Sequence, residues 1–139
     1  DSRANNLAVE KLFTPYIWSQ EMVLHLFSVL ILAASVGLSA FIDNIPYVAA
    51  MLPVVQGVAA LMNGGAGIEP ELFYFGLLTG ATLGGNLTPI GASANIAAIG
   101  ILRKNGERVR TSDFLRIGVP FTLAAVLVGA GSLWLFWGV

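Results

Sequence analysis

The sequence predicts an all-α integral membrane protein with a re-entrant helical hairpin, a discontinuous transmembrane helix and a terminal transmembrane helix. Hydrophobic residues make up 56% of the 139-residue chain and charged residues only 11%, whereas an ordinary soluble domain carries about 25% charged residues. Residues 72–102 contain no charged side chain. As one continuous helix they would be roughly 46 Å long, against a hydrocarbon core of about 30 Å. Glycines and a proline inside this run predict that the helix is broken.

Residues 1–21 mix aromatic and charged side chains, including Glu10, Lys11 and Trp18. This mixture is typical of the membrane interface, so we expect an interfacial arm that lies along the surface. The first residues include no initiator Met and do not have the pattern of a signal peptide. We therefore expect the sequence to be part of a longer chain.

Residues 22–62 contain two apolar runs that meet at the short turn Asp43-Asn44-Ile45-Pro46. An Asn that can cap a helix, followed by a Pro in the first turn, is a start signal for the second helix. The first run is long enough for a full span. Surface turns between spans usually contain Lys, Arg or interfacial aromatics, and this turn has none. This favours a re-entrant hairpin, whose tip stops inside the membrane, over two full spans.

Residues 63–71 are rich in glycine and contain two glutamates, which predicts a loop. The discontinuous transmembrane helix at residues 72–102 follows it. Irregular backbone at membrane depth is tolerated only where protein or a water-filled cavity satisfies its polar groups. The stretch 83–96 is therefore a candidate binding site. It combines helix breakers and polar side chains, namely Gly84, Gly85, Asn86, Thr88, Pro89, Gly91, Ser93 and Asn95.

Residues 103–113 form a loop whose first eight positions hold four of the chain's seven basic residues. By the positive-inside rule, segment 103–110 is cytoplasmic. Residues 114–139 are predicted to form the terminal transmembrane helix, which runs outward. It closes with an aromatic belt at Trp134, Phe136 and Trp137. Loop 63–71 and both ends of the hairpin are then expected outside.

Asp43 and Asn44 are the candidate site residues of the hairpin tip. An Asp near the membrane midplane costs about 2.5 to 3.5 kcal/mol to insert, so we expect Asp43 to be paired with a cation, a proton or helix-terminal donors. If the turn lies at the surface instead, Asp43 is solvated and caps a helix. Asn44 either caps the second helix or contributes to the site, and the two roles are compatible.

The broken segment supplies the other half of the candidate site. The helix before the break ends in carbonyl oxygens, and the helix that starts near Ser93 begins with free backbone donors. Cations and anions therefore both find a complement. Asn86, Thr88 and Asn95 add neutral oxygen ligands, which suit a hard cation such as sodium.

The remaining patterns indicate packing and exclude several classes of function. Gly76, Gly80 and Gly84 are spaced four apart and predict a ridge at which another helix approaches closely. The chain has no cysteine, which excludes disulfides and thiolate metal sites. We find no paired carboxylates, nucleophile constellation, phosphate loop or His-rich metal spacing in the sequence. We therefore expect that the protein is not an enzyme, does not bind nucleic acid and holds no cofactor. A bound sodium ion is the one candidate for a tightly held non-protein group.

Two motifs, SAFIDNIP at Ser39–Pro46 and GGNLTPIGASAN at Gly84–Asn95, resemble the ion transporter superfamily. The most similar group contains arsenite permeases, NhaD-type sodium/proton antiporters, the melanosomal P protein and citrate transporter-like proteins. The resemblance covers about residues 12–139 and implies that this chain is the C-terminal half of an inverted-repeat transporter, with an inverted N-terminal half missing from it. It also implies a dimer that moves its substrate by an elevator-like displacement of the hairpin domain.

The resemblance places Asp43, Asn44 and Ile45 at the hairpin tip, where dicarboxylate transporters of the superfamily have Ser-Asn-Thr. Only Asn44 matches that tripeptide. The acidic residue instead resembles the Asp-Asn-Ile/Val-Pro tip of the P-protein and antiporter branch. The unwound helix, where this family contacts sodium and substrate, corresponds to Thr88, Pro89, Gly91, Ser93 and Asn95.

These observations predict a secondary active transporter in the cell (inner) membrane that moves a small ion or anion coupled to sodium or protons. Sodium/proton antiport is the leading hypothesis. The alternatives are a carrier of arsenite, citrate or dicarboxylate, a channel, and a non-transporting structural subunit with continuous helix through residues 84–95. The expected partners are membrane lipid, the missing N-terminal half, a second copy in a homodimer, and the transported ion or anion. The candidate sodium ligands are Asn44, Thr88 and Asn95.

Overall fold

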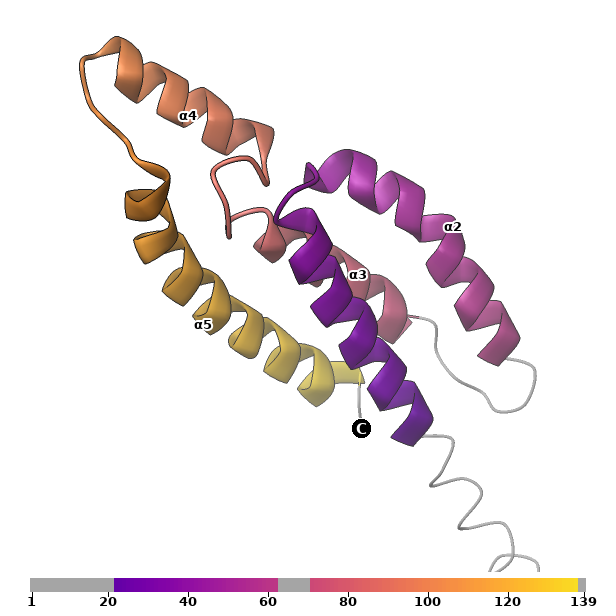
Figure 1. The fold of residues 1–139 in the computed structure, drawn as a ribbon. Helices are drawn as coiled ribbons and strands as arrows, with labels where there is room; N and C mark the ends of the chain where they lie inside the picture. Colours follow the sequence, from indigo (N-terminus) through magenta and orange to yellow (C-terminus); the bar gives the residue numbers. More distant parts are fainter. Residues whose placement is uncertain (1–21, 63–70, 138–139) are drawn as a thin grey trace, which may run out of the picture.

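The computed structural model describes residues 22–62 and 71–137, and the regular structure in these ranges is entirely α-helical (Figure 1). Its helices are Met22–Ser39, α2 (Asn44–Met62), α3 (Glu71–Gly84), α4 (Ser93–Lys104) and α5 (Thr111–Trp137). The all-α prediction is therefore confirmed. The predicted arm 1–21 and nearly all of the predicted loop 63–71 lie outside the described residues.

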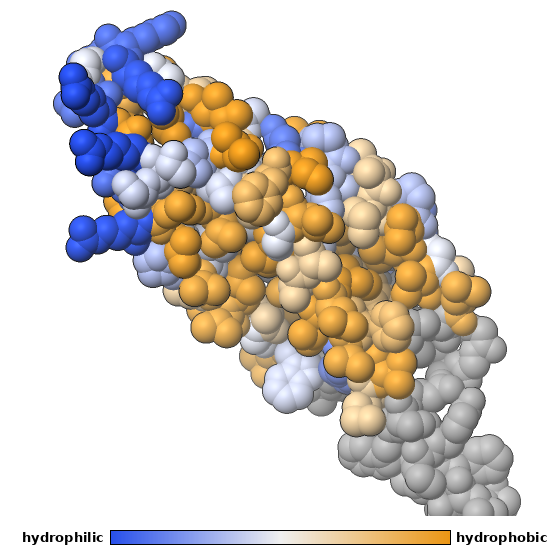
Figure 2. Space-filling view, viewed as in Figure 1, coloured by the Kyte–Doolittle hydropathy of each residue, from blue (hydrophilic) through white to orange (hydrophobic). Residues whose placement is uncertain are grey.

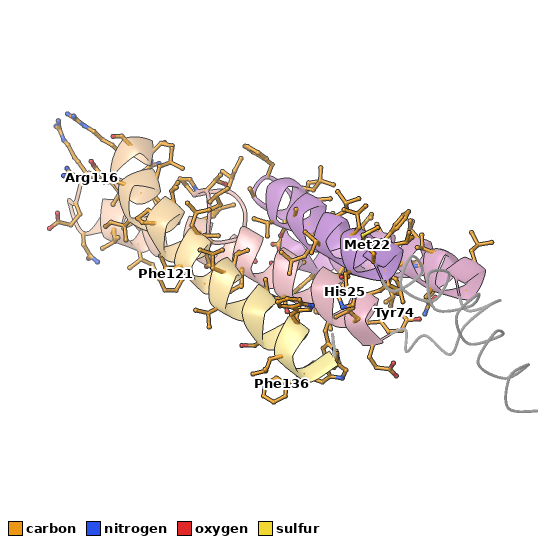
Figure 3. All side chains as sticks on the ribbon, turned by 90° about the horizontal axis from the view of Figure 1, so that it is seen from below. Met22, His25, Tyr74, Arg116, Phe121 and Phe136 are labelled. Atoms are coloured by element: carbon orange, nitrogen blue, oxygen red, sulfur yellow. The ribbon has the colours of Figure 1, made fainter. Side chains whose placement is uncertain are left out.

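Three of these helices are long and apolar enough to cross a membrane, namely Met22–Ser39, Asn44–Leu61 within α2, and Thr111–Trp137. Figure 2 shows apolar side chains along the body of the molecule and hydrophilic side chains gathered at one end. Arg116 lies at that end, and Met22, His25 and Tyr74 lie toward the other (Figure 3). This distribution is typical of an integral membrane protein, whose apolar surface faces lipid or further protein.

A turn of four residues joins helix Met22–Ser39 to α2. The amides of Phe41 and Ile42 both donate to the Leu38 carbonyl, which closes the first helix. The Tyr47 amide donates to the Asp43 carbonyl at 3.1 Å, so Asp43 occupies the capping position and Asn44 is the first helical residue. The backbone thus differs from the expectation that Asn44 caps this helix, because α2 begins one residue earlier than that role requires.

The glycine ridge of α3 packs against helix Met22–Ser39, as its spacing predicts. A Cβ atom at Gly80 would lie 2.5 Å from the Leu32 carbonyl oxygen, and one at Gly84 would lie 2.5 Å from that of Val36. The absence of side chains at these positions lets the two backbones approach closely. The Ser39 hydroxyl adds a buried hydrogen bond of 2.6 Å to the Ala81 carbonyl.

The other faces of α3 contact α2 and α5, so α3 is the central helix of the described fold (Figure 1). The buried core between α2 and α3 is formed by Tyr47, Val55, Ala59, Phe73, Leu77 and Ala81. The Tyr47 hydroxyl donates to Ser35 Oγ at 3.1 Å and links the two helices of the hairpin. These contacts hold the hairpin firmly against α3, which places its tip beside the end of α3.

Helix stops at Gly84 and resumes at Ser93, within the stretch where glycines and Pro89 disfavour it. From this break α4 extends past the hairpin tip, and α5 returns along α3 toward the other end of the molecule (Figure 1). The non-helical part of the predicted loop 103–113 is only 105–110, because α4 continues through Lys104 and α5 begins at Thr111. Basic residues in the last turn of α4 and Asp113 in the first turn of α5 are favourable with the helix dipoles.

Candidate functional site

The side chain of Asn95, in the first turn of α4, binds the non-helical residues between α3 and α4. Its side-chain amide nitrogen donates to the Gly85 carbonyl at 2.9 Å and to the Thr88 carbonyl at 3.2 Å. Asn95 lies in the first turn of α4, so this side chain fastens the start of α4 to the end of α3. These two hydrogen bonds satisfy backbone carbonyls that the break leaves without helical partners.

The same loop is fastened to the hairpin at Thr88 and Gly91. The Thr88 hydroxyl donates to the Ala40 carbonyl, at the end of helix Met22–Ser39. A Cβ atom at Gly91 would lie 2.7 Å from the Gly85 carbonyl oxygen, 2.8 Å from that of Ala40 and 3.0 Å from that of Ser39. Only glycine fits between these three oxygens, which makes Gly91 the point where the loop and the hairpin touch.

Asp43 joins the hairpin tip directly to α4. The backbone amide of Ser93, the first residue of α4, donates to Asp43 Oδ2 at 3.1 Å. The residue before it, Ala92, occupies the capping position and makes no side-chain capping bond. The acceptor that a local Ser, Thr or Asp would normally supply therefore comes from a residue 50 positions earlier in the chain. This is the helix-terminal donor that the sequence predicted as one possible partner of Asp43.

The structure brings five of the nine predicted site residues into one hydrogen-bonded or close-packed unit: Asp43, Thr88, Gly91, Ser93 and Asn95. Asn86 lies beside them, but its amide donates to the Thr82 carbonyl of its own chain segment at 3.4 Å. Asn44 and Pro89 are half-buried, and Ile45 is 77% exposed. Of these three side chains only that of Asn44 can form a hydrogen bond, and none from it to the broken segment is found among the described residues.

Helix α5 contributes residues that the sequence patterns do not point to. A Cβ atom at Gly118 would lie 2.8 Å from the Asn86 carbonyl oxygen, so α5 packs against the break. One turn later, Thr122 is 1% exposed, and its hydroxyl has no hydrogen-bond partner within residues 22–62 and 71–137. Small residues in an apolar helix give no polar signal in a sequence, and the contact depends on how α5 folds back.

The chemistry available at this unit is that of oxygen ligands and one carboxylate. Within the described residues there is no group of three or more His, Cys, Asp or Glu side chains, so a transition-metal site is not supported there. Three backbone carbonyls converge at Gly91, and carbonyl and carboxylate oxygens are ligands that suit a hard cation. Thr88 donates to the hairpin and Asn95 donates to carbonyls of the loop. The predicted contacts of their oxygen atoms to sodium stay a prediction.

Comparison with known proteins shows that the chain is similar in sequence to membrane transporters. The chain is 42% identical over 106 residues to an uncharacterized transporter of Mycobacterium tuberculosis. It is 36% identical over 117 residues to an uncharacterized transporter of Synechocystis, and 38% identical over 101 residues to the P protein of Homo sapiens. These matches cover 76%, 75% and 73% of this chain. No family model and no solved structure matches it.

The matches cover only a small part of each relative. The chain spans 24% of the length of the mycobacterial transporter, 26% of the cyanobacterial one and 12% of the human P protein. Three quarters of this sequence is thus homologous to one part of larger proteins. The mycobacterial and cyanobacterial homologues are described as transporters and not as enzymes, in agreement with the sequence prediction.

Proposed function

We propose that this chain forms one half of a secondary active transporter that exchanges sodium for protons across the membrane, with Asp43 at its ion site. The chain is an integral membrane segment homologous to part of membrane transporters. The observation that carries the proposal is the contact between Asp43 and Ser93. It brings the hairpin tip and a broken helix together in the arrangement that transporters use to bind ions near the midplane.

The length of α4, rather than that of the hairpin helices, supports a re-entrant hairpin. The tip lies beside the first residue of α4, and the 12 residues of α4 extend about 18 Å beyond it. Ile96, Ile101 and Leu102 of α4 are exposed and apolar, which suits lipid or protein contact rather than water. If the basic segment 103–110 marks one surface of a hydrocarbon core of about 30 Å, the tip then lies well inside it.

The lengths of α3 and α4 support a single broken transmembrane element. Their 14 and 12 residues cover about 21 Å and about 18 Å, which together approach the length of about 40 Å of the 27-residue α5. The structural-subunit alternative predicted continuous helix through residues 84–95, whereas α3 ends at Gly84 and α4 begins at Ser93. The break with its fastened loop therefore favours transport over a purely structural role.

In the proposed exchange, the Asp43 carboxylate binds sodium and a proton in turn. Backbone carbonyls at the break, together with Asn44, Ile45, Asn86, Thr88, Pro89 and Asn95, form the surrounding wall. Asp43 is half-buried in this chain, and only its Oδ2 atom has a hydrogen-bond partner among the described residues, the Ser93 amide, so the carboxylate keeps a further oxygen that can bind an ion. Following the resemblance, we include in the proposal an inverted N-terminal half, a homodimer, and a cytoplasmic position for segment 103–110.

The ion-site assignment is tested by flux in proteoliposomes that contain the complete transporter, in which this chain is joined to the proposed N-terminal half. We expect Asp43→Asn to lower sodium-driven proton flux at least tenfold. The Asn side chain still accepts the Ser93 amide, but it neither carries a negative charge nor exchanges a proton. Asp113→Asn, at the exposed start of α5, is the matched control and should retain wild-type flux. Equal flux in the Asp43 variant and the wild type would refute the assignment of Asp43.

The depth of the hairpin tip is tested by cysteine labelling, because this chain has no cysteine of its own. Phe41 is 68% exposed at the tip, and Glu107 is exposed in the basic segment. We expect a membrane-impermeant maleimide to modify Glu107→Cys in inverted membrane vesicles at least tenfold faster than Phe41→Cys, since a thiol in hydrocarbon does not ionise. Similar rates at the two positions would favour two full spans.

A further inference from the structure

The Lys and Arg side chains of the described residues all lie at one end of the molecule, where α4 stops and α5 begins. This basic end comprises residues 103–116, and Figure 2 shows it as the hydrophilic end of an apolar body. Its basic residues come from the last turn of α4, the following loop and the second turn of α5, and all are exposed: Arg103, Lys104, Arg108, Arg110 and Arg116.

The positive charges of the basic end are not neutralised by the chain itself. Among residues 22–62 and 71–137, none of these five side chains forms an ion pair with a carboxylate. The two acidic residues of the basic end are Glu107 and Asp113, which leaves a net charge of +3 for five basic residues. Asp113 Oδ2 accepts the backbone amide of Arg110 rather than a guanidinium group. The basic end is therefore a surface that attracts anions.

Exposed apolar side chains adjoin the charges on both helices. Ile101 and Leu102 precede the basic residues of α4, a helix in which no residue is buried. In α5, Ile117 is 74% exposed beside Arg116, and Phe121 is 60% exposed one turn further on. A phospholipid likewise carries its phosphate directly next to its acyl chains. The surface therefore has the charge and the apolar parts that a bound phospholipid would contact.

The position of Arg116 along α5 suits the level of lipid phosphates. It lies about 8 Å along the helix axis from Thr111, where α5 begins. The headgroup layer on each side of a bilayer is about 5 to 8 Å thick, so the loop and Arg116 together cover this layer. Four of the five basic residues are arginines, and the planar guanidinium group binds a phosphate through two parallel hydrogen bonds.

We propose that the basic end is a binding site for anionic phospholipids, in which Arg116 contacts the headgroup phosphate and the adjoining apolar side chains contact the acyl chains. The inference goes beyond the proposed ion exchange and holds for any transported ion. Positive charge by itself orients a protein in the membrane. Arginines that lack ion-pair partners and adjoin exposed apolar side chains also provide the contacts that an anionic lipid requires.

The test measures the thermal unfolding midpoint of the complete transporter, purified in detergent, as dioleoyl phosphatidylglycerol is added. Detergent removes any effect of the substitutions on orientation in the membrane. We expect this anionic lipid to raise the wild-type midpoint by several degrees, because a ligand that binds the folded state stabilises it. Dioleoyl phosphatidylcholine has the same acyl chains and no net charge, and should leave the midpoint nearly unchanged.

Substitutions at the basic end assign the response to its arginines. Arg116→Gln should lose at least half of the rise caused by phosphatidylglycerol. Arg116→Lys keeps the charge but not the paired hydrogen bonds, so its response should lie between those of Arg116→Gln and the wild type. Glu107→Gln is the matched control, because it removes an exposed charge of the opposite sign from the same end. It should keep the full response.

Three results would overturn the inference. They are an equal rise with phosphatidylcholine, an equal rise with inorganic phosphate at the same concentration, and a wild-type response in Arg116→Gln. The first would show that headgroup charge is not recognised, and the second that a soluble anion rather than a lipid occupies the site. If Arg116→Gln does not fold, Arg103→Gln takes its place under the same criterion. A failure of the proposed ion exchange is distinguishable, because it is seen as absent flux and leaves the midpoint measurement intact.

Discussion

Gly80→Ala is expected to prevent the folded protein from accumulating. The added methyl carbon would lie 2.5 Å from the Leu32 carbonyl oxygen and 2.7 Å from Ser35 Cβ. Backbone and a buried Cβ atom cannot rotate away, so helix Met22–Ser39 and α3 must separate. Overpacking of this kind costs about 3 kcal/mol, and the separation also weakens the buried contacts of the hairpin core.

The matched control is Gly57→Ala, which adds the same methyl group inside a helix. A Cβ atom at Gly57 has nothing within 4 Å in the described structure, and Ala is favoured over Gly in a helix by roughly 0.5 to 1 kcal/mol. The two substitutions are therefore predicted to change stability in opposite directions. Monodisperse yield and thermal unfolding of the detergent-purified full chain measure both effects. A Gly80→Ala protein as stable as Gly57→Ala would contradict the close packing of the ridge.

Gly91→Ala is expected to reduce transport to the background of empty liposomes while the protein still inserts. Its methyl carbon would lie within 3.0 Å of three carbonyl oxygens, those of Ser39, Ala40 and Gly85. Two of these oxygens belong to the hairpin and one to the broken segment. Relief of the clash therefore requires the loop to move away from the hairpin. That movement also strains the contact between Asp43 and Ser93, which holds the proposed ion site together.

Gly100→Ala provides the comparison for this second substitution. Gly100 lies in α4, the helix that follows Gly91, and a Cβ atom there meets nothing within 4 Å. Flux in proteoliposomes, normalised to the amount of inserted protein, should be unchanged in Gly100→Ala. Wild-type flux in Gly91→Ala would show that the loop tolerates displacement and that its position is not part of the ion site.

Much of the arrangement around the break could be predicted from local sequence. The glycines, Pro89 and the polar side chains between them indicate where helix stops, and Ser93 was expected near the start of the next helix. Gly76, Gly80 and Gly84 indicated a close helix contact by their spacing alone. These predictions succeed because backbone freedom, missing donors and helical periodicity act over a few residues.

The partners of individual groups could not be predicted, because they depend on contacts between distant segments. The sequence left Asp43 several partners, and the Ser93 amide is selected only when the hairpin packs beside α4. Thr88 and Asn95 were expected as ion ligands, whereas their donors hold the loop in place. The contribution of Gly118 follows from the return of α5 along α3, which no local pattern records.

The contact between Asp43 and Ser93 also has a consequence for biogenesis. Helices shorter than about 12 to 15 residues are marginal in isolation, and α4 has 12 residues and no capping bond from its own Ala92. Its cap is synthesised 50 residues earlier, so the hairpin has left the ribosome before α4 emerges. Because synthesis runs from the N-terminus, Asp43 is available to cap α4 as soon as α4 forms. In a circular permutant that begins after the hairpin, α4 would emerge before Asp43 is synthesised and would lack its capping residue until the hairpin follows.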